Sequence, residues 1–277
     1  METLKSIFRF YINGSIHVAV AITSMVQITF VKFDISDQYF FLLLSFFGAI
    51  TAYNFVKYSN VSKLYHKRLT RSMKGIRFLT IFCALIYAYI IFQIPLKTLL
   101  FLLPFVALTV FYVVPILPKK KNLRNLAGIK IFIIAVVWSG TTVLVPMLHV
   151  NNTIDLNVLI EAVQRFLFII IIMLPFEIRD LQYDDATLET VPQKIGVTKT
   201  KVFGSILLVM FLLLTPVKEN VLFSSIEILS TILVTSITLF FLWGTERKQS
   251  EYYCSFWVES IPIFWLLIIV VLQGLFT

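Results

Sequence analysis

Charged residues are scarce in this sequence, and acidic residues are absent from its central part. Only 14% of the 277 residues are charged, whereas 58% are hydrophobic. A soluble domain of this length cannot bury so much apolar surface. No aspartate or glutamate occurs between Asp37 and Asp155. The composition therefore excludes a soluble protein. It predicts an all-α, polytopic membrane protein, with a single integral membrane domain over residues 1–277.

Cysteine and histidine are also rare, which excludes two common kinds of site. Cys83 and Cys254 are too few and too far apart for a disulfide framework, so we expect two free thiols. His17, His66 and His149 do not have the spacing of metal ligands. Any chemistry of this chain must therefore come from other residue types.

Long apolar runs fill most of the chain. A membrane-spanning helix needs about 20 mostly apolar residues. We therefore expect a bundle of nine transmembrane helices. Their approximate ranges are 13–31, 39–56, 76–94, 98–117, 129–149, 157–176, 202–217, 226–244 and 257–276.

Lysine and arginine alternate from one side of these spans to the other. All but four of the 24 lysine and arginine residues lie before the first span or around the loops after even-numbered spans. Basic residues favour the cytoplasmic side. We therefore expect a bacterial-type inner (plasma) membrane protein, with the N-terminus in the cytoplasm and the C-terminus outside. The same rule accounts for the net charge of +9, so we expect no nucleic-acid partner.

Residues 175–196 join two apolar runs and contain a group of carboxylates. In a helix, Glu177, Asp180 and Asp184 would fall at i, i+3 and i+7 on one stripe, with Asp185 beside it. Because like charges repel, such a stripe favours a bound cation. Mg²⁺ takes carboxylate oxygens and often shares them with substrate phosphates, so these residues predict a magnesium site. The alternative interpretation is an ordinary charged loop between two spans.

A cationic cluster follows the fourth predicted span. Lys119, Lys120, Lys121 and Arg124 come after two prolines that end the helix. Such clusters bind phosphate groups well, and Tyr112 could direct its hydroxyl at a phosphate. The alternative is anchoring to anionic lipid head groups, with Tyr112 at the membrane interface. Acidic and basic groups on one side of an apolar bundle favour a ligand with a charged head and an apolar tail, such as an isoprenyl diphosphate.

Two segments resemble motifs of the UbiA superfamily of intramembrane prenyltransferases. Residues 179–184 are similar to its second aspartate-rich motif, Asp-x-x-x-Asp, and residues 190–196 are similar to the Thr-Leu-Pro-like stretch and glycine that follow it. Residues 112–121 are similar to the Tyr-to-Lys segment after helix four. By number and order of spans, the resemblance covers most of the chain and implies a nine-helix UbiA-type bundle.

The family's first aspartate-rich motif, near the end of helix two, is missing. Asn54 matches its first asparagine, but Phe55, Tyr58 and Ser62 stand at the aspartate positions. Two magnesium ions held by two acidic motifs are therefore excluded. We expect at most a single or weakened Mg²⁺ site, with a basic side chain in place of the missing cation.

The resemblance implies transfer of an isoprenyl group from a prenyl diphosphate to a lipophilic, aromatic acceptor within the bilayer. Asp180 and Asp184 would be catalytic and would hold Mg²⁺, with Glu177 or Asp185 assisting. The residues implied for diphosphate binding are Tyr112, Lys119, Lys121, Lys194, Asn54, Lys57 and Arg68.

Two other functions fit the same sequence. The missing first motif favours a catalytically degenerate UbiA-like membrane protein that binds an isoprenoid lipid without turnover. The third possibility is an unrelated multi-pass transporter. Charged residues buried within the spans would favour it, and the sequence contains few of them.

Overall fold

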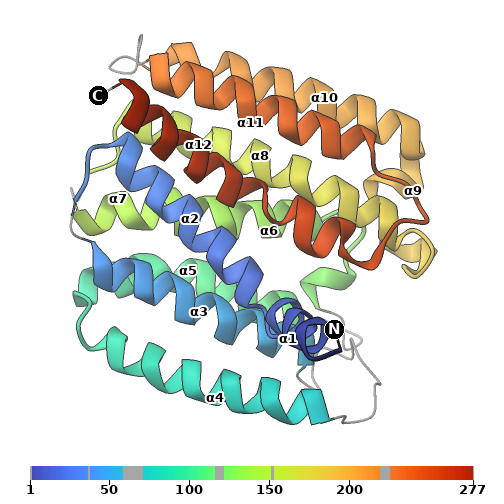
Figure 1. Ribbon diagram of the computed structural model, residues 1–277, viewed down its shortest axis with the longest axis horizontal. Helices are drawn as coiled ribbons and strands as arrows, with labels where there is room; N and C mark the ends of the chain where they lie inside the picture. The colour runs from blue at the N-terminus through green and yellow to red at the C-terminus, as the bar shows by residue number, and fades with distance from the viewer. Residues whose placement is uncertain are drawn as a thin grey trace.

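The computed structural model describes residues 2–36, 38–58, 71–115, 122–150, 153–218 and 225–276. These residues form helices and connecting turns, and no strand occurs within the described ranges. The helices run side by side in one bundle (Figure 1). The predicted all-α helical bundle is confirmed.

The elements follow the apolar runs of the sequence closely, with short α, 3₁₀ and π segments between the long helices. In order they are α1 (Glu2–Asn13), α2 (Ile16–Lys32), α3 (Tyr39–Tyr58), α4 (Arg71–Ile91), α5 (Leu96–Val113), η2 (Leu123–Asn125), α6 (Lys130–Ser139), η3 (Gly140–Leu144), α7 (Val145–Val150), α8 (Leu156–Asp180), η4 (Ala186–Leu188), α9 (Val191–Ile195), α10 (Val197–Leu213), η5 (Thr215–Val217), α11 (Ser225–Trp243), η6 (Tyr253–Val258) and α12 (Ile261–Phe276).

Eight helices of the described chain are long and apolar enough to cross a membrane. A ninth span is present if the bent pair α1 and α2 is counted as one. Each of the nine predicted spans coincides with one of these helices or with α2. The length and apolar character of these helices agree with an integral membrane protein.

The sequence analysis missed α1 as a helix. Leu4, Ile7 and Phe8 recur at i, i+3 and i+4, which is the spacing of an amphipathic helix. The helix ends before Ser15, whose φ of 61° is left-handed, and α2 then continues at an angle of 53°. Leu4 and Ile7 are 73% and 61% exposed. A helix with this pattern can lie in the membrane interface.

Helix α8 is the centre of the bundle. Of its most apolar stretch, 78% is buried, compared with 17% for α4. In Figure 1, α8 lies between the pair α10 and α11 on one side and α2 and α6 on the other, whereas α4 lies at the edge. The largest core cluster is accordingly built on residues 167–174 of α8. Since α8 ends at Asp180, the most deeply buried helix of the described bundle leads directly into the acidic segment.

A buried ionic cluster closes the other end of α8. Arg165 donates to Glu161 at 3.0 Å, and Lys32 and Lys218 donate to the second oxygen of the same carboxylate. Glu227 pairs with Lys32 and Lys218 at 3.3 Å and 3.0 Å. The expectation that buried charges are sparse is therefore wrong. The cluster ties α2, α8 and α11 together, because each charge has partners on other elements.

Candidate functional site: a cavity with a charged mouth

A cavity of about 1310 Å³ lies among α2, α3, α5, α6, α8 and the start of the last span. Apolar side chains line it along the helices, including Ile22, Leu44, Leu102, Phe105 and Ile134. Charged side chains line the end at which α3 and α8 terminate, and we call this end the mouth. The charged residues that line the cavity include Lys57, Arg124, Arg179, Asp180, Asp184 and Glu259.

The two aspartates of the acidic segment reach the mouth by different backbone routes. Asp180 is the last residue of α8. A turn then begins, in which the backbone N–H of Asp184 donates to the carbonyl of Asp180 at 2.8 Å. This turn brings the Asp184 carboxylate back to the cavity although the helix has ended. The structure thus brings together Asp180 and Asp184, as predicted, but not through a continuous helical stripe.

Both aspartates contact cations of the protein itself. Lys130 Nζ lies 3.4 Å from Asp184 Oδ2 and 3.9 Å from Asp180 Oδ2. Arg179 Nε donates to Asp180 Oδ1 at 2.8 Å. The pair of carboxylates is therefore bridged by a lysine that begins α6.

The other two predicted magnesium ligands lie elsewhere. Glu177 is 2% exposed, and its Oε2 accepts from the backbone N–H of Val191 at 3.3 Å, which fixes α9 against α8. Asp185 is exposed and accepts from the backbone N–H of Thr187 at 2.9 Å. That hydrogen bond holds the pKa of Asp185 below its usual value. Neither carboxylate lines the cavity.

The arrangement does not fit the predicted magnesium site. Among the described residues, no group of three or more carboxylate, histidine or cysteine side chains could hold a metal ion. Asp180 and Asp184 meet at the mouth, but Lys130 contacts both. Magnesium stays a prediction that the geometry of these residues does not support.

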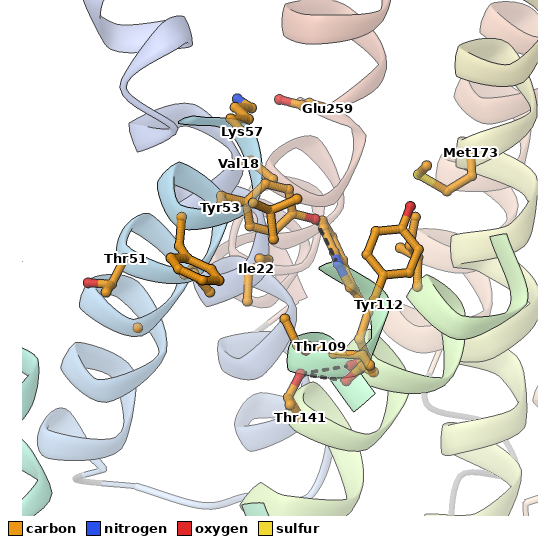
Figure 2. A pocket seen from close by; sticks show the side chains of 18 of the residues that line it. Val18, Ile22, Thr51, Tyr53, Lys57, Thr109, Tyr112, Thr141, Met173 and Glu259 are labelled. Atoms are coloured by element: carbon orange, nitrogen blue, oxygen red, sulfur yellow. Dashed lines mark hydrogen bonds between the residues drawn. The ribbon is translucent and has the colours of Figure 1, made fainter. Parts of the chain in front are cut away.

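A second charged pair stands across the mouth. Lys57, near the end of α3, and Glu259, which follows the π-helix η6, point toward each other in Figure 2. Arg179 lines the same end of the cavity. π-Helical turns often occur at functional sites because they redirect the side chains that follow. The predicted role of Lys57 at the mouth is consistent with this position.

Two tyrosines mark the wall between the charged mouth and the apolar part of the cavity. Tyr112, predicted as a phosphate ligand, is 8% exposed and lines the cavity (Figure 2). Tyr53 accepts a hydrogen bond from Trp138 Nε1 at 2.9 Å. Both side chains offer aromatic faces to a ligand, and Tyr112 keeps a hydroxyl near the mouth.

Two residues predicted to bind diphosphate do not reach the cavity. Asn54 is 2% exposed, and its amide donates to the carbonyl of Gly14 at 3.1 Å and to Thr80 Oγ1 at 3.0 Å. It therefore joins α3 to the α1–α2 turn and to α4. Lys194 is largely exposed and pairs with Glu189 at 2.6 Å. The structure places Asn54 in helix packing and Lys194 on the surface. Lys119, Lys121 and Arg68 lie outside the described residues.

Four charged residues of the site were not predicted. Lys130 and Arg179 were counted only as basic residues near loops, Arg124 only as part of the cationic cluster, and Glu259 was overlooked. Glu259 carried a usable signal, since a carboxylate at the start of an apolar span requires a functional or structural reason. The contact of Lys130 with Asp184 joins residues 54 positions apart, and no local pattern indicates it.

Comparisons with known proteins identify the fold. No protein-family model and no curated protein matches the sequence. A solved structure of a digeranylgeranylglyceryl phosphate synthase, an enzyme in membranes, superposes on the chain with a TM-score of 0.59 and covers 98% of each chain. The sequences are 14% identical. The chain therefore has the fold of a UbiA-type membrane prenyltransferase.

Proposed function

We propose that this protein transfers an isoprenyl group from a prenyl diphosphate to a lipophilic, aromatic acceptor within the membrane. One observation carries the proposal: a cavity lined by apolar side chains ends at a charged mouth, inside a UbiA-type fold. An apolar cavity with a few convergent polar groups is the usual form of a ligand site. The prenyl tail occupies the apolar part, and the diphosphate occupies the mouth.

The mouth supplies the charge that the leaving group needs. In the reaction, the bond between C1 of the prenyl group and the diphosphate oxygen breaks, and the electron pair leaves with the oxygen. Lys57, Arg124 and Arg179 line this end of the cavity and stabilise the negative charge as it develops. Arg179 and Arg124 offer several N–H donors to phosphate oxygens, whereas Lys57 acts as a point charge.

The cavity wall stabilises the allylic cation that forms when the diphosphate leaves. Tyr53, Tyr112 and Trp138 line the region beside the mouth, where their faces stabilise an allylic cation and exclude water. A π electron pair of the acceptor forms the new bond to C1, and the acceptor then loses a proton. Glu259 accepts this proton, because it is a carboxylate of the cavity wall that does not take part in the ion pairs of Lys130 and Arg179 with the aspartates.

The test is turnover by the purified protein in liposomes. We expect farnesyl or geranylgeranyl diphosphate, together with lipids extracted from the native membrane, to yield inorganic diphosphate and an equal amount of prenylated lipid. Glu259→Gln should keep prenyl diphosphate binding but lose most of the turnover. The proposal is overturned if no prenyl diphosphate binds.

A catalytically degenerate lipid-binding protein is the second candidate. The observation that favours it is the pairing of Asp180 and Asp184 with Lys130 and Arg179, together with the absent first aspartate-rich motif. Prenyl diphosphate that binds but releases no diphosphate in the liposome experiment would establish this candidate. Transport has no comparable support, since the buried ionic cluster does not line the cavity.

A further inference from the structure

Lys130 occupies the place between the two aspartates of the acidic segment. Its Nζ lies within 4 Å of one carboxylate oxygen of each, at 3.4 Å for Asp184 and 3.9 Å for Asp180. The side chains of Lys130, Asp180 and Asp184 are only 11%, 22% and 14% exposed. An ion pair this well shielded from water is much less weakened by salt than a surface pair.

The position of Lys130 along the backbone does not favour a positive charge. It is the first residue of α6. The N-terminus of a helix carries a partial positive charge, which disfavours a cation at that position. The aspartates supply the compensating negative charge.

Arg179 completes the neutralisation of the aspartates. It donates to Oδ1 of Asp180, and Lys130 faces Oδ2 of the same carboxylate. Both oxygens of Asp180 and one oxygen of Asp184 therefore face cations of the chain itself. A divalent ion that binds here would have to displace Lys130 from the two carboxylates. The ion would then lie close to the positive charge of Arg179, which contacts Asp180.

We propose that Lys130 takes the place of a divalent metal ion in the aspartate segment, so that the mouth binds its anionic ligand through the chain's own cations. The exclusion of metal follows from the lysine contacts alone. The identity of the anion as a diphosphate rests on the proposed function.

This arrangement changes how a diphosphate is held. A divalent ion normally bridges carboxylates and phosphate oxygens that would otherwise repel each other. Here the carboxylates are already neutralised, so an arriving diphosphate meets Arg179, Lys57 and Arg124 without that repulsion. Lys130 itself donates to Asp184 and does not line the cavity, so its part is to neutralise the aspartates and not to contact the phosphate.

The first experiment measures metal binding directly, on the full-length protein in detergent. Titration with Mn²⁺, followed by electron paramagnetic resonance, compares the wild type with Lys130→Met and Lys130→Gln. Both variants should bind Mn²⁺ about tenfold more tightly than the wild type, which corresponds to about 1.4 kcal/mol. Lys199→Met is the matched control, because Lys199 is exposed on α10, and it should behave as the wild type. Wild-type affinity equal to that of both Lys130 variants would overturn the inference.

The second experiment separates the inference from the proposed function. Binding of inorganic diphosphate is measured in EDTA and in saturating Mg²⁺. The wild-type affinity should be the same in both, whereas Lys130→Met should bind about tenfold more tightly in Mg²⁺ than in EDTA. A wild type that needs Mg²⁺ overturns the inference and leaves the proposed function intact. If the wild type binds no diphosphate in either buffer, the proposed function fails, and the Mn²⁺ comparison still decides the role of Lys130.

Discussion

The charged residues at the mouth come from different helices, and the role of each can be tested by a single substitution. Lys57 belongs to α3, Glu259 to the last span and Arg179 to α8. The sequence analysis selected Lys57 because it follows Asn54 in the remnant of the first aspartate-rich motif. The structure gives a better reason, since Lys57 faces the cavity and Asn54 does not.

Lys57→Ala should weaken binding of a prenyl diphosphate by about 10- to 150-fold, because a charged hydrogen-bond donor to a phosphate contributes about 1.5–3 kcal/mol. The measurement is a binding titration in EDTA with farnesyl diphosphate. Lys199→Ala serves as the surface control, since Lys199 is exposed and does not line the cavity. If both variants lose the same small amount of affinity, Lys57 does not bind the diphosphate and serves only as a basic residue that orients the protein in the membrane.

Glu161→Gln should destabilise the protein by about 3–5 kcal/mol, because it leaves buried cations without their shared carboxylate. Arg165, Lys32 and Lys218 all pair with Glu161, whose side chain is 0% exposed. Thermal unfolding in detergent measures the effect. Glu189→Gln, which removes a half-exposed pair with Lys194, should cost no more than about 1 kcal/mol. A similar shift for both variants would show that the buried cluster does not stabilise the bundle.

At the scale of single elements, α8 explains which site residues the sequence could predict. Carboxylates at the end of a long apolar run pointed to Asp180 and Asp184, and both line the cavity, whereas their role stays a prediction. The helical stripe was the wrong reason, because α8 ends at Asp180 and a turn, η4 and α9 follow. That turn directs Asp185 to the surface and leaves Glu177 against α9. Local spacing does not specify where a helix ends, so it could not separate these four carboxylates.

Gly140→Ala tests how closely the elements around the cavity are packed. A Cβ at Gly140, the first residue of the π-helix η3, would lie 1.9 Å from the ring of Phe105 on α5. Phe105 lines the cavity, so its ring must shift. We expect a loss of about 1–3 kcal/mol in stability and a weaker affinity for longer prenyl chains.

The measurements for Gly140→Ala are thermal unfolding and binding of prenyl diphosphates of increasing length. Gly274→Ala is the matched control, because a Cβ there has no atom within 4 Å. Unchanged stability and chain-length preference in Gly140→Ala would mean that α5 and η3 are packed less tightly than described.

At the scale of the whole molecule, hydropathy predicted the bundle well. Each predicted span coincides with a helix, because a helix in lipid needs a long apolar run and such a run can be recognised in a single sequence. The cavity, the Lys130 contact and the buried ionic cluster were not predicted. Each depends on side chains brought together from helices far apart in the sequence, and a hydropathy profile has no information on such contacts.

The orientation of the bundle stays a prediction from the distribution of basic residues. Reporter fusions at the N-terminus and after Thr277 should indicate opposite sides of the membrane, with the N-terminus in the cytoplasm. The same-side result for both fusions would require an even number of spans. In that case the bent pair α1 and α2 would not span the membrane, and eight spans would remain in the described chain.

The proposed function depends most directly on where a prenyl diphosphate binds. The decisive measurement is photolabelling with a farnesyl diphosphate that carries a diazirine at the end of its tail, followed by peptide mapping. Label on Leu102, Phe105 or Val106 of α5, abolished by excess inorganic diphosphate, is the predicted result, because these residues line the apolar part of the cavity. Label on the lipid-exposed residues Phe78 and Phe82 of α4, unaffected by diphosphate, would contradict the account.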